Sequence, residues 1–162
     1  MKPHSKLIIY GDGGSRGNPG EAAYGFAVFD EDNNQIYGEG KRIGVNTNNV
    51  AEYSAVINAF RWVIEHYPNI EELVFRLDSL LVARQMDGKF KVKHPNMREL
   101  FIMAKRLESQ LSAQIIYSQI PREQNKTADQ LVNDALDYKI WSCLGYANAA
   151  DGLVNDALDF KI

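Results

Sequence analysis

The order of strand-like and helical patterns constrains this chain more than any other feature of its sequence. Three strand-like segments come first, at residues 7–10, 22–29 and 35–45, with turn residues between them. The remaining predicted elements are a helix at 55–64, a strand at 73–77, helices at 79–86 and 97–111, a strand at 113–120 and a helix from residue 127. This order predicts an α/β fold with a five-stranded mixed sheet, first antiparallel and then parallel, flanked by helices.

The composition excludes several classes of protein. The 162 residues are 45% hydrophobic, which suits one domain with a real core. No apolar run approaches the roughly 18 residues of a membrane span, and the four apolar residues at 7–10 are too few for a signal peptide. The single cysteine, Cys143, excludes an intramolecular disulfide. We therefore expect a cytoplasmic protein with no membrane segment.

Charge is unevenly distributed although the net charge is only −3. Residues 84–106 contain seven basic and two acidic side chains, a local charge of +5, whereas residues 129–162 contain six Asp and two Lys, a local charge of −4. A basic block of this kind either faces a polyanion or is a solvated helix face.

The C-terminal part contains a near-copy of an earlier segment. Residues 128–140 read ADQLVNDALDYKI and residues 150–162 read ADGLVNDALDFKI, with eleven of thirteen positions identical. Two copies are too few for a solenoid. The sequence thus divides into a functional domain at 1–140 and a tail at 141–162. We expect a monomer, and a swapped dimer formed through the tail is the alternative.

Four acidic residues fall where predicted elements begin or end: Asp12, Glu52, Asp78 and Asp129. Each has a structural explanation on its own, respectively a turn, a helix-start pairing with Asn49, a helix cap and a helix-dipole partner. If strands 7–10 and 73–77 are parallel neighbours, however, Asp12 and Asp78 share one edge of the sheet.

Clustered carboxylates repel one another, so a site that retains them needs cations. Oxygen ligands without His or Cys favour Mg²⁺ or Mn²⁺. Two such ions about 3.5–4 Å apart hold the attacking water and the leaving oxygen of a phosphodiester in line. The pattern therefore indicates phosphoryl chemistry.

Four motifs in this order resemble those of type 1 ribonuclease H, over about residues 6–138. They are YGDGGSRGNPG (10–20), TNNVAE (47–52), LDS (77–79) and PREQNKTAD (121–129). The resemblance implies a ribonuclease H-like fold and an endoribonuclease that hydrolyses the RNA strand of RNA–DNA hybrids, leaving 5′-phosphate and 3′-hydroxyl ends. It implies two Mg²⁺ ions per site, with Mn²⁺ as a substitute, held by the catalytic acids Asp12, Glu52, Asp78 and Asp129.

The resemblance also implies substrate contacts. Asn18, Asn48 and Asn49 match positions that contact the minor groove of the hybrid, where amides bind 2′-hydroxyls. The Gly13–Gly14 pair allows close approach of nucleic acid to the main chain. Ser79 is either a backbone contact or a helix start.

The sequence departs from the family pattern at three places. No histidine lies in the loop before Asp129. Arg122 stands there, and is either an electrostatic partner of the leaving phosphate or a plain surface residue. The basic protrusion of many bacterial members is reduced to a short segment in which Lys89, Lys91 and Lys93 offer partial phosphate contact. Asp151 duplicates Asp129, but only Asp129 follows the loop with Asn125, so we assign Asp129 to the site.

Two other functions stay open at this point. One is a module that binds hybrid or structured RNA without cutting it. The other is a nuclease for another substrate, such as double-stranded RNA, or a domain of a polymerase-associated chain.

Overall fold

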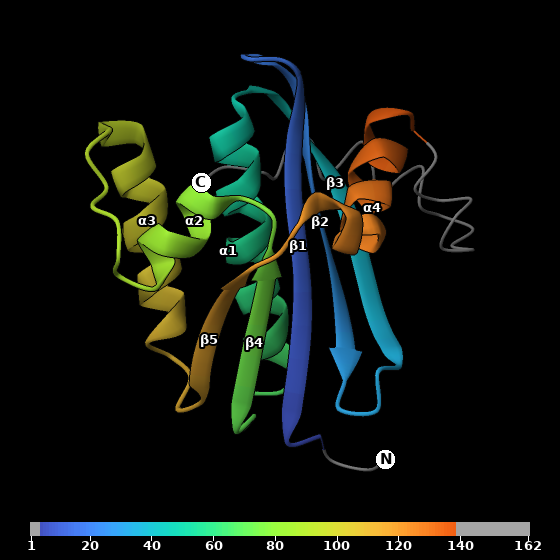
Figure 1. The fold of residues 1–162 in the computed structure, drawn as a ribbon, viewed down its shortest axis with the longest axis vertical. Coiled ribbons are helices and arrows are strands. Elements are labelled where there is room, and N and C mark those ends of the chain that lie inside the picture. Colours follow the sequence, from blue (N-terminus) through green and yellow to red (C-terminus); the bar gives the residue numbers. More distant parts are fainter. Residues whose placement is uncertain (1–3, 139–162) are drawn as a thin grey trace.

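The computed structural model describes residues 4–138 and contains a five-stranded sheet (Figure 1). The spatial order of the strands is β3-β2-β1-β4-β5. β1 pairs antiparallel with β2 and parallel with β4, and β4 pairs parallel with β5. The mixed sheet predicted from the sequence is confirmed. The strands are β1 (Lys6–Gly17), β2 (Gly20–Asp30), β3 (Gln35–Asn46), β4 (Glu72–Leu77) and β5 (Gln114–Gln119).

Helices cover both faces of the sheet (Figure 1). Three of them pack on one face and the fourth packs on the other, against β1, β2 and β3. A short 3-10 turn, Arg122–Gln124, precedes the fourth helix. The helices are α1 (Asn48–His66), α2 (Leu80–Met86), α3 (Pro95–Glu108) and α4 (Lys126–Leu136).

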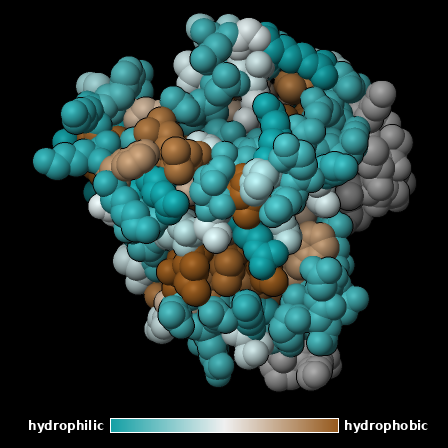
Figure 2. Space-filling view, in the orientation of Figure 1, coloured by the Kyte–Doolittle hydropathy of each residue, from teal (hydrophilic) through white to brown (hydrophobic). Residues whose placement is uncertain are grey.

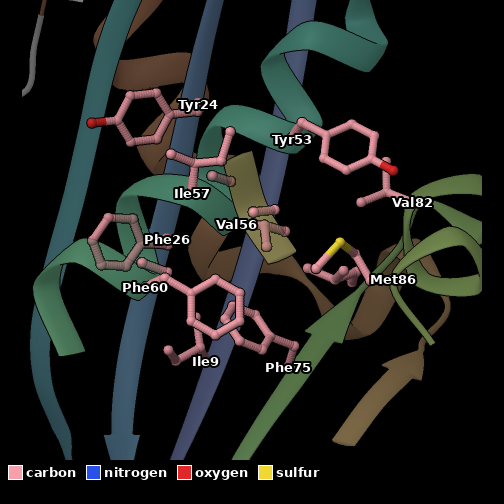
Figure 3. Close-up of a cluster of buried hydrophobic side chains, with 14 of the residues drawn as sticks. Ile9, Tyr24, Phe26, Tyr53, Val56, Ile57, Phe60, Phe75, Val82 and Met86 are labelled. Atoms are coloured by element: carbon pink, nitrogen blue, oxygen red, sulfur yellow. The ribbon is translucent and has the colours of Figure 1, made fainter. Parts of the chain in front are cut away.

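The main core lies between the sheet and α1 (Figure 3). Aromatic rings dominate it, and Phe60 of α1 lies against Phe75 of β4 with ring centroids 4.8 Å apart. A smaller cluster on the other face joins Ala23 of β2 to Val132, Ala135 and Leu136 of α4. The two clusters fix α1 and α4 to opposite faces because each helix buries one apolar stripe.

α4 covers only part of its face of the sheet. Figure 2 shows an apolar band across the lower half of this face, over the parallel strands. Ile8, Val74 and Ile116 are in register there on β1, β4 and β5. α4 instead lies over the upper part of the antiparallel strands, against β1, β2 and β3 (Figure 1).

Strand β1 is longer than predicted. The glycines after Tyr10 were expected to stop it, yet it continues through them to Gly17, which pairs with Gly20. The reason is non-local, because β2 supplies a hydrogen-bonding partner along this whole length. Asp12 consequently lies within β1, one residue beyond the last β1–β4 pair, Gly11 with Leu77.

The structural explanations offered for Glu52 and Asp78 do not hold. Thr47, not Asn49, caps α1, since its hydroxyl accepts a hydrogen bond from the Val50 amide at 3.3 Å. The first turn of this described helix holds no acidic residue, so Glu52 lies in the second turn and is not part of a capping box. Ser79, not Asp78, caps α2 by accepting from the Val82 amide at 3.2 Å.

Within residues 4–138, none of the helices combines the length and apolarity that a membrane span requires. The second copy at 150–162, its Asp151, the proposed boundary at residue 140 and Cys143 all lie outside the described residues.

Candidate active site

Three of the four predicted acids converge on one point. Asp12 comes from β1, Glu52 from α1 and Asp78 from the residue after β4. One carboxylate oxygen of each lies within 4.8 Å of the other two. Asp12 is buried, at 2% exposure, and the other two are half-buried.

Gly13 of β1 has no side chain, and this allows α1 to come close to the three acids. A Cβ atom on Gly13 would lie 2.2 Å from the carbonyl carbon of Ala51 and 2.3 Å from the nitrogen of Glu52. No real side chain fits that space. Gly13 therefore lets the backbone of α1, and hence Glu52, approach Asp12.

A second glycine does the same for α4. Gly25 of β2 lies directly opposite Asp12 in the β1–β2 register. A Cβ atom there would lie 2.8 Å from the carbonyl oxygen of Ala128 and 2.9 Å from Cβ of Leu131. Gly25 therefore lets the N-terminal half of α4, which carries Asp129, lie close to the sheet beside Asp12.

The three converging acids line a cavity of about 550 Å³. Asp129 lies outside the tight group of three but lines this cavity. Asn18 alone of the predicted site residues does not line it, although its Oδ1 accepts from the backbone amide of Asn48 at 3.0 Å. The other predicted residues that line the cavity are Gly13, Gly14, Asn48, Asn49, Ser79 and Arg122.

Burial and repulsion by neighbouring carboxylates raise the pKa of the three converging acids. Burial, reinforced by the charges of Asp78 and Asp129, raises the pKa of Asp12 to about 7. Burial, with the charges of Asp12 and Asp78, raises the pKa of Glu52 well above its usual range. Burial also raises the pKa of Asp78, and the positive charge of Arg122 opposes the rise for both aspartates. A bound cation would reverse these shifts.

The donor set fits a hard divalent cation. Asp12 Oδ1 and Asp78 Oδ2 are buried and have no hydrogen-bond partner among the described residues. Buried polar atoms are rarely left unpaired unless an ion or water satisfies them. Carboxylate oxygens without nitrogen or sulfur donors are the ligands of Mg²⁺ and Mn²⁺.

The asparagines beside the acids are held by their carbonyl ends. Asn48 Oδ1 accepts a hydrogen bond from the Ser15 amide at 2.9 Å, just as Asn18 Oδ1 accepts from Asn48. Both side chains are exposed. Because their oxygens are occupied, their NH₂ groups are the ends that remain to donate to a ligand.

The Ser79 side chain makes a hydrogen bond within the fold, whereas the Arg122 side chain is exposed at the cavity. The Ser79 hydroxyl caps α2, which satisfies its structural explanation. Arg122 is exposed, lines the cavity and acts electrostatically on Asp12 and Asp78.

Several residues of the site were not predicted. Asn133 Nδ2 donates to the backbone oxygen of Asp129 at 3.1 Å and to its carboxylate at 3.3 Å. The four-residue spacing of this pair on a helix was a usable signal. The others depend on how α4 packs against β1, which no local pattern reveals. They are Ser15, Arg16, Val132 and Leu136.

Known proteins resemble both the fold and the sequence. The profile of the family described as reverse transcriptase-like matches residues 11–135. The bifunctional protein Rv2228c of Mycobacterium tuberculosis is 42% identical over 146 residues, which are 90% of this chain and 39% of that protein. The chain thus spans about two fifths of the length of the mycobacterial relatives that it matches.

Two solved structures resemble this one over nearly their whole length. RNase H1 of the archaeon Halobacterium salinarum has a TM-score of 0.76 and 36% identity, covering 82% of this chain and 98% of that one. LC11-RNase H1, solved in complex with an RNA/DNA hybrid, has a TM-score of 0.79 and 40% identity, covering 82% and 97%.

The mixed sheet with a carboxylate cluster where its parallel pairing ends defines the ribonuclease H-like class of folds. Within that class, the chain belongs to the type 1 ribonuclease H family.

Proposed function

We propose that this chain is a metal-dependent endoribonuclease that hydrolyses the RNA strand of RNA–DNA hybrids. The observation that carries the proposal is the convergence of Asp12, Glu52 and Asp78, with buried carboxylate oxygens that lack a partner. The similarity to LC11-RNase H1, which was solved with an RNA/DNA hybrid, supports the choice of substrate.

The four acids would hold two Mg²⁺ ions, with Mn²⁺ as a substitute. Two ions in such a site activate the attacking water and stabilise the leaving oxygen of the phosphodiester. Asp12, Glu52 and Asp78 offer the tight ligand group, and Asp129 lines the same cavity from α4. Cleavage on the 3′-oxygen side of the phosphate would leave 5′-phosphate and 3′-hydroxyl ends.

Substrate contacts would follow from the donors around the acids. The NH₂ groups of Asn18 and Asn48 would donate to 2′-hydroxyl oxygens in the minor groove, and Asn49 would contact the same groove. Gly14 and the backbone at Ser79 line the cavity close to the acids. Arg122 would attract the scissile phosphate and, in a loop without histidine, stabilise charge on the leaving group.

Matched duplexes of one sequence test the proposal. RNA–DNA, RNA–RNA and DNA–DNA duplexes are incubated with the protein in Mg²⁺ or Mn²⁺, with Asp78→Asn as the control. We expect only the RNA strand of the hybrid to be shortened, only with metal and only by the unmutated chain. A shifted hybrid without shorter products would indicate a binding module, and cleavage of RNA–RNA alone would indicate another substrate.

A cytoplasmic location, a monomeric state and a functional domain ending near residue 140 stay predictions of the sequence.

A further inference from the structure

One buried side-chain amide lies between the end of the β1–β4 pairing and the start of α4, next to the acids of the site. Asn125 sits between the 3-10 turn and α4 and is completely buried. We propose that Asn125 is a positioning residue that sets the relative placement of Asp12, Asp78 and Asp129, an inference that rests on the proposed function of these acids.

The first contact ties Asn125 to the strand that carries Asp12. Its Nδ2 donates to the backbone oxygen of Gly11 at 2.8 Å, in a buried hydrogen bond that joins residues 114 positions apart. Gly11 precedes Asp12 and forms the last β1–β4 pair. The amide therefore holds the loop at the place where β1 leaves β4.

The second contact is indirect and reaches Asp78. Gly11, whose oxygen accepts the hydrogen bond from Asn125, pairs with Leu77, the residue before Asp78. The Asn125 side chain also opposes the rise in the pKa of the Asp78 carboxyl. Asn125 thereby fixes the ends of the two strands that lead to Asp12 and Asp78.

The third contact reaches the helix of Asp129. The backbone oxygen of Asn125 accepts from the Asp129 amide at 3.1 Å, in the first turn of α4. Its own amide donates to the Arg122 oxygen at 3.0 Å. One residue thus joins the end of the β1–β4 pairing to the start of α4, two parts of the site that are distant in sequence.

A role in stability alone does not account for this amide. Asn125 Oδ1 is buried without a hydrogen-bond partner among the described residues, as are Asp12 Oδ1 and Asp78 Oδ2. An amide retained only to fasten a loop would be expected to have both ends satisfied, because a bare buried oxygen is unfavourable. Only the NH₂ group of Asn125 makes a hydrogen bond, and its acceptor is Gly11, the residue before Asp12.

Asn125→Ala and Asn125→Ser test this role, with Asn58→Ala as the matched control. Asn58 Nδ2 donates to the Ser54 oxygen at 2.8 Å inside α1, so its loss also removes one amide-to-backbone bond but does not touch the cavity lining. The serine variant keeps a shorter donor and should fall between alanine and the unmutated chain. It also supplies a second variant if Asn125→Ala does not fold.

Three quantities are measured on each full-length variant below its melting temperature. They are the affinity for Mn²⁺ without substrate, and kcat and KM on an RNA–DNA hybrid. We expect the Asn125 variants to lose about 10- to 100-fold in Mn²⁺ affinity and in kcat, with little change in KM, as for other groups that orient metal ligands. Asn58→Ala should retain both values.

Folded Asn125 variants that bind Mn²⁺ and turn over hybrid like the unmutated chain would overturn the inference, even if they melt earlier. An unmutated chain that binds Mn²⁺ but cleaves no hybrid would instead contradict the proposed function. The comparison of Mn²⁺ affinities would still decide the role of Asn125 in that case.

Discussion

At the scale of single residues, the raised pKa of Asp12 links the site to stability. Its carboxyl has a pKa of about 7 in the metal-free fold, against about 4 in an unfolded chain. The folded state therefore holds more protons between about pH 4 and pH 7, so metal-free stability falls as pH rises through this window. The fall is at most about 4 kcal/mol, from 1.36 kcal/mol for each pKa unit.

We predict that Asp12→Asn reduces the loss of stability between pH 4 and pH 7, so the metal-free protein is more stable than the unmutated chain at pH 8. The same variant should abolish cleavage. Urea unfolding with a chelator at pH 5 and pH 8 measures the effect. Asp30→Asn is the control, because backbone amides of Asn34 and Asp32 lower the pKa of Asp30. That variant should instead lose stability at pH 8. A fall with pH that is as steep in Asp12→Asn as in the unmutated chain would contradict the account.

At the scale of elements, Gly25 sets the distance between α4 and the sheet. We predict that Gly25→Ala forces α4 outward, because the new Cβ would meet the Ala128 oxygen at 2.8 Å. Displacements of about 1 Å at such sites reduce rates by about 100-fold. Cleavage rate and thermal midpoint are compared with those of the unmutated chain. A rate equal to that of the unmutated chain would show that the approach of α4 is unimportant.

The elements also show what the sequence could predict. Apolar periodicity and short apolar runs located the five strands and four helices that lie within residues 4–138. It missed the extension of β1 beyond Gly11, which depends on pairing with β2. The positions of the acids at element ends and the motif resemblance predicted the site, of which three acids converge tightly. The burial of Asn125 and the packing role of Gly13 depend on contacts between distant segments, so neither could be predicted.

At the scale of the whole molecule, every residue assigned to the site lies between positions 12 and 136. We predict that a chain ended after residue 140 keeps its cleavage rate, and that Asp151→Asn is equally active. Cleavage assays and size-exclusion mass of both proteins test this. A dimer that loses its activity in either variant would favour the swapped arrangement through the tail.

Binding of Mn²⁺, followed by calorimetry on the unmutated chain, Asp12→Asn and Asp78→Asn, tests most directly whether the converged carboxylates form a metal site. We predict saturable binding that is lost or at least tenfold weaker in each variant, since each removes one negative charge from the tight group of ligands. Unchanged affinity in both variants would contradict it, because the ions would then bind elsewhere.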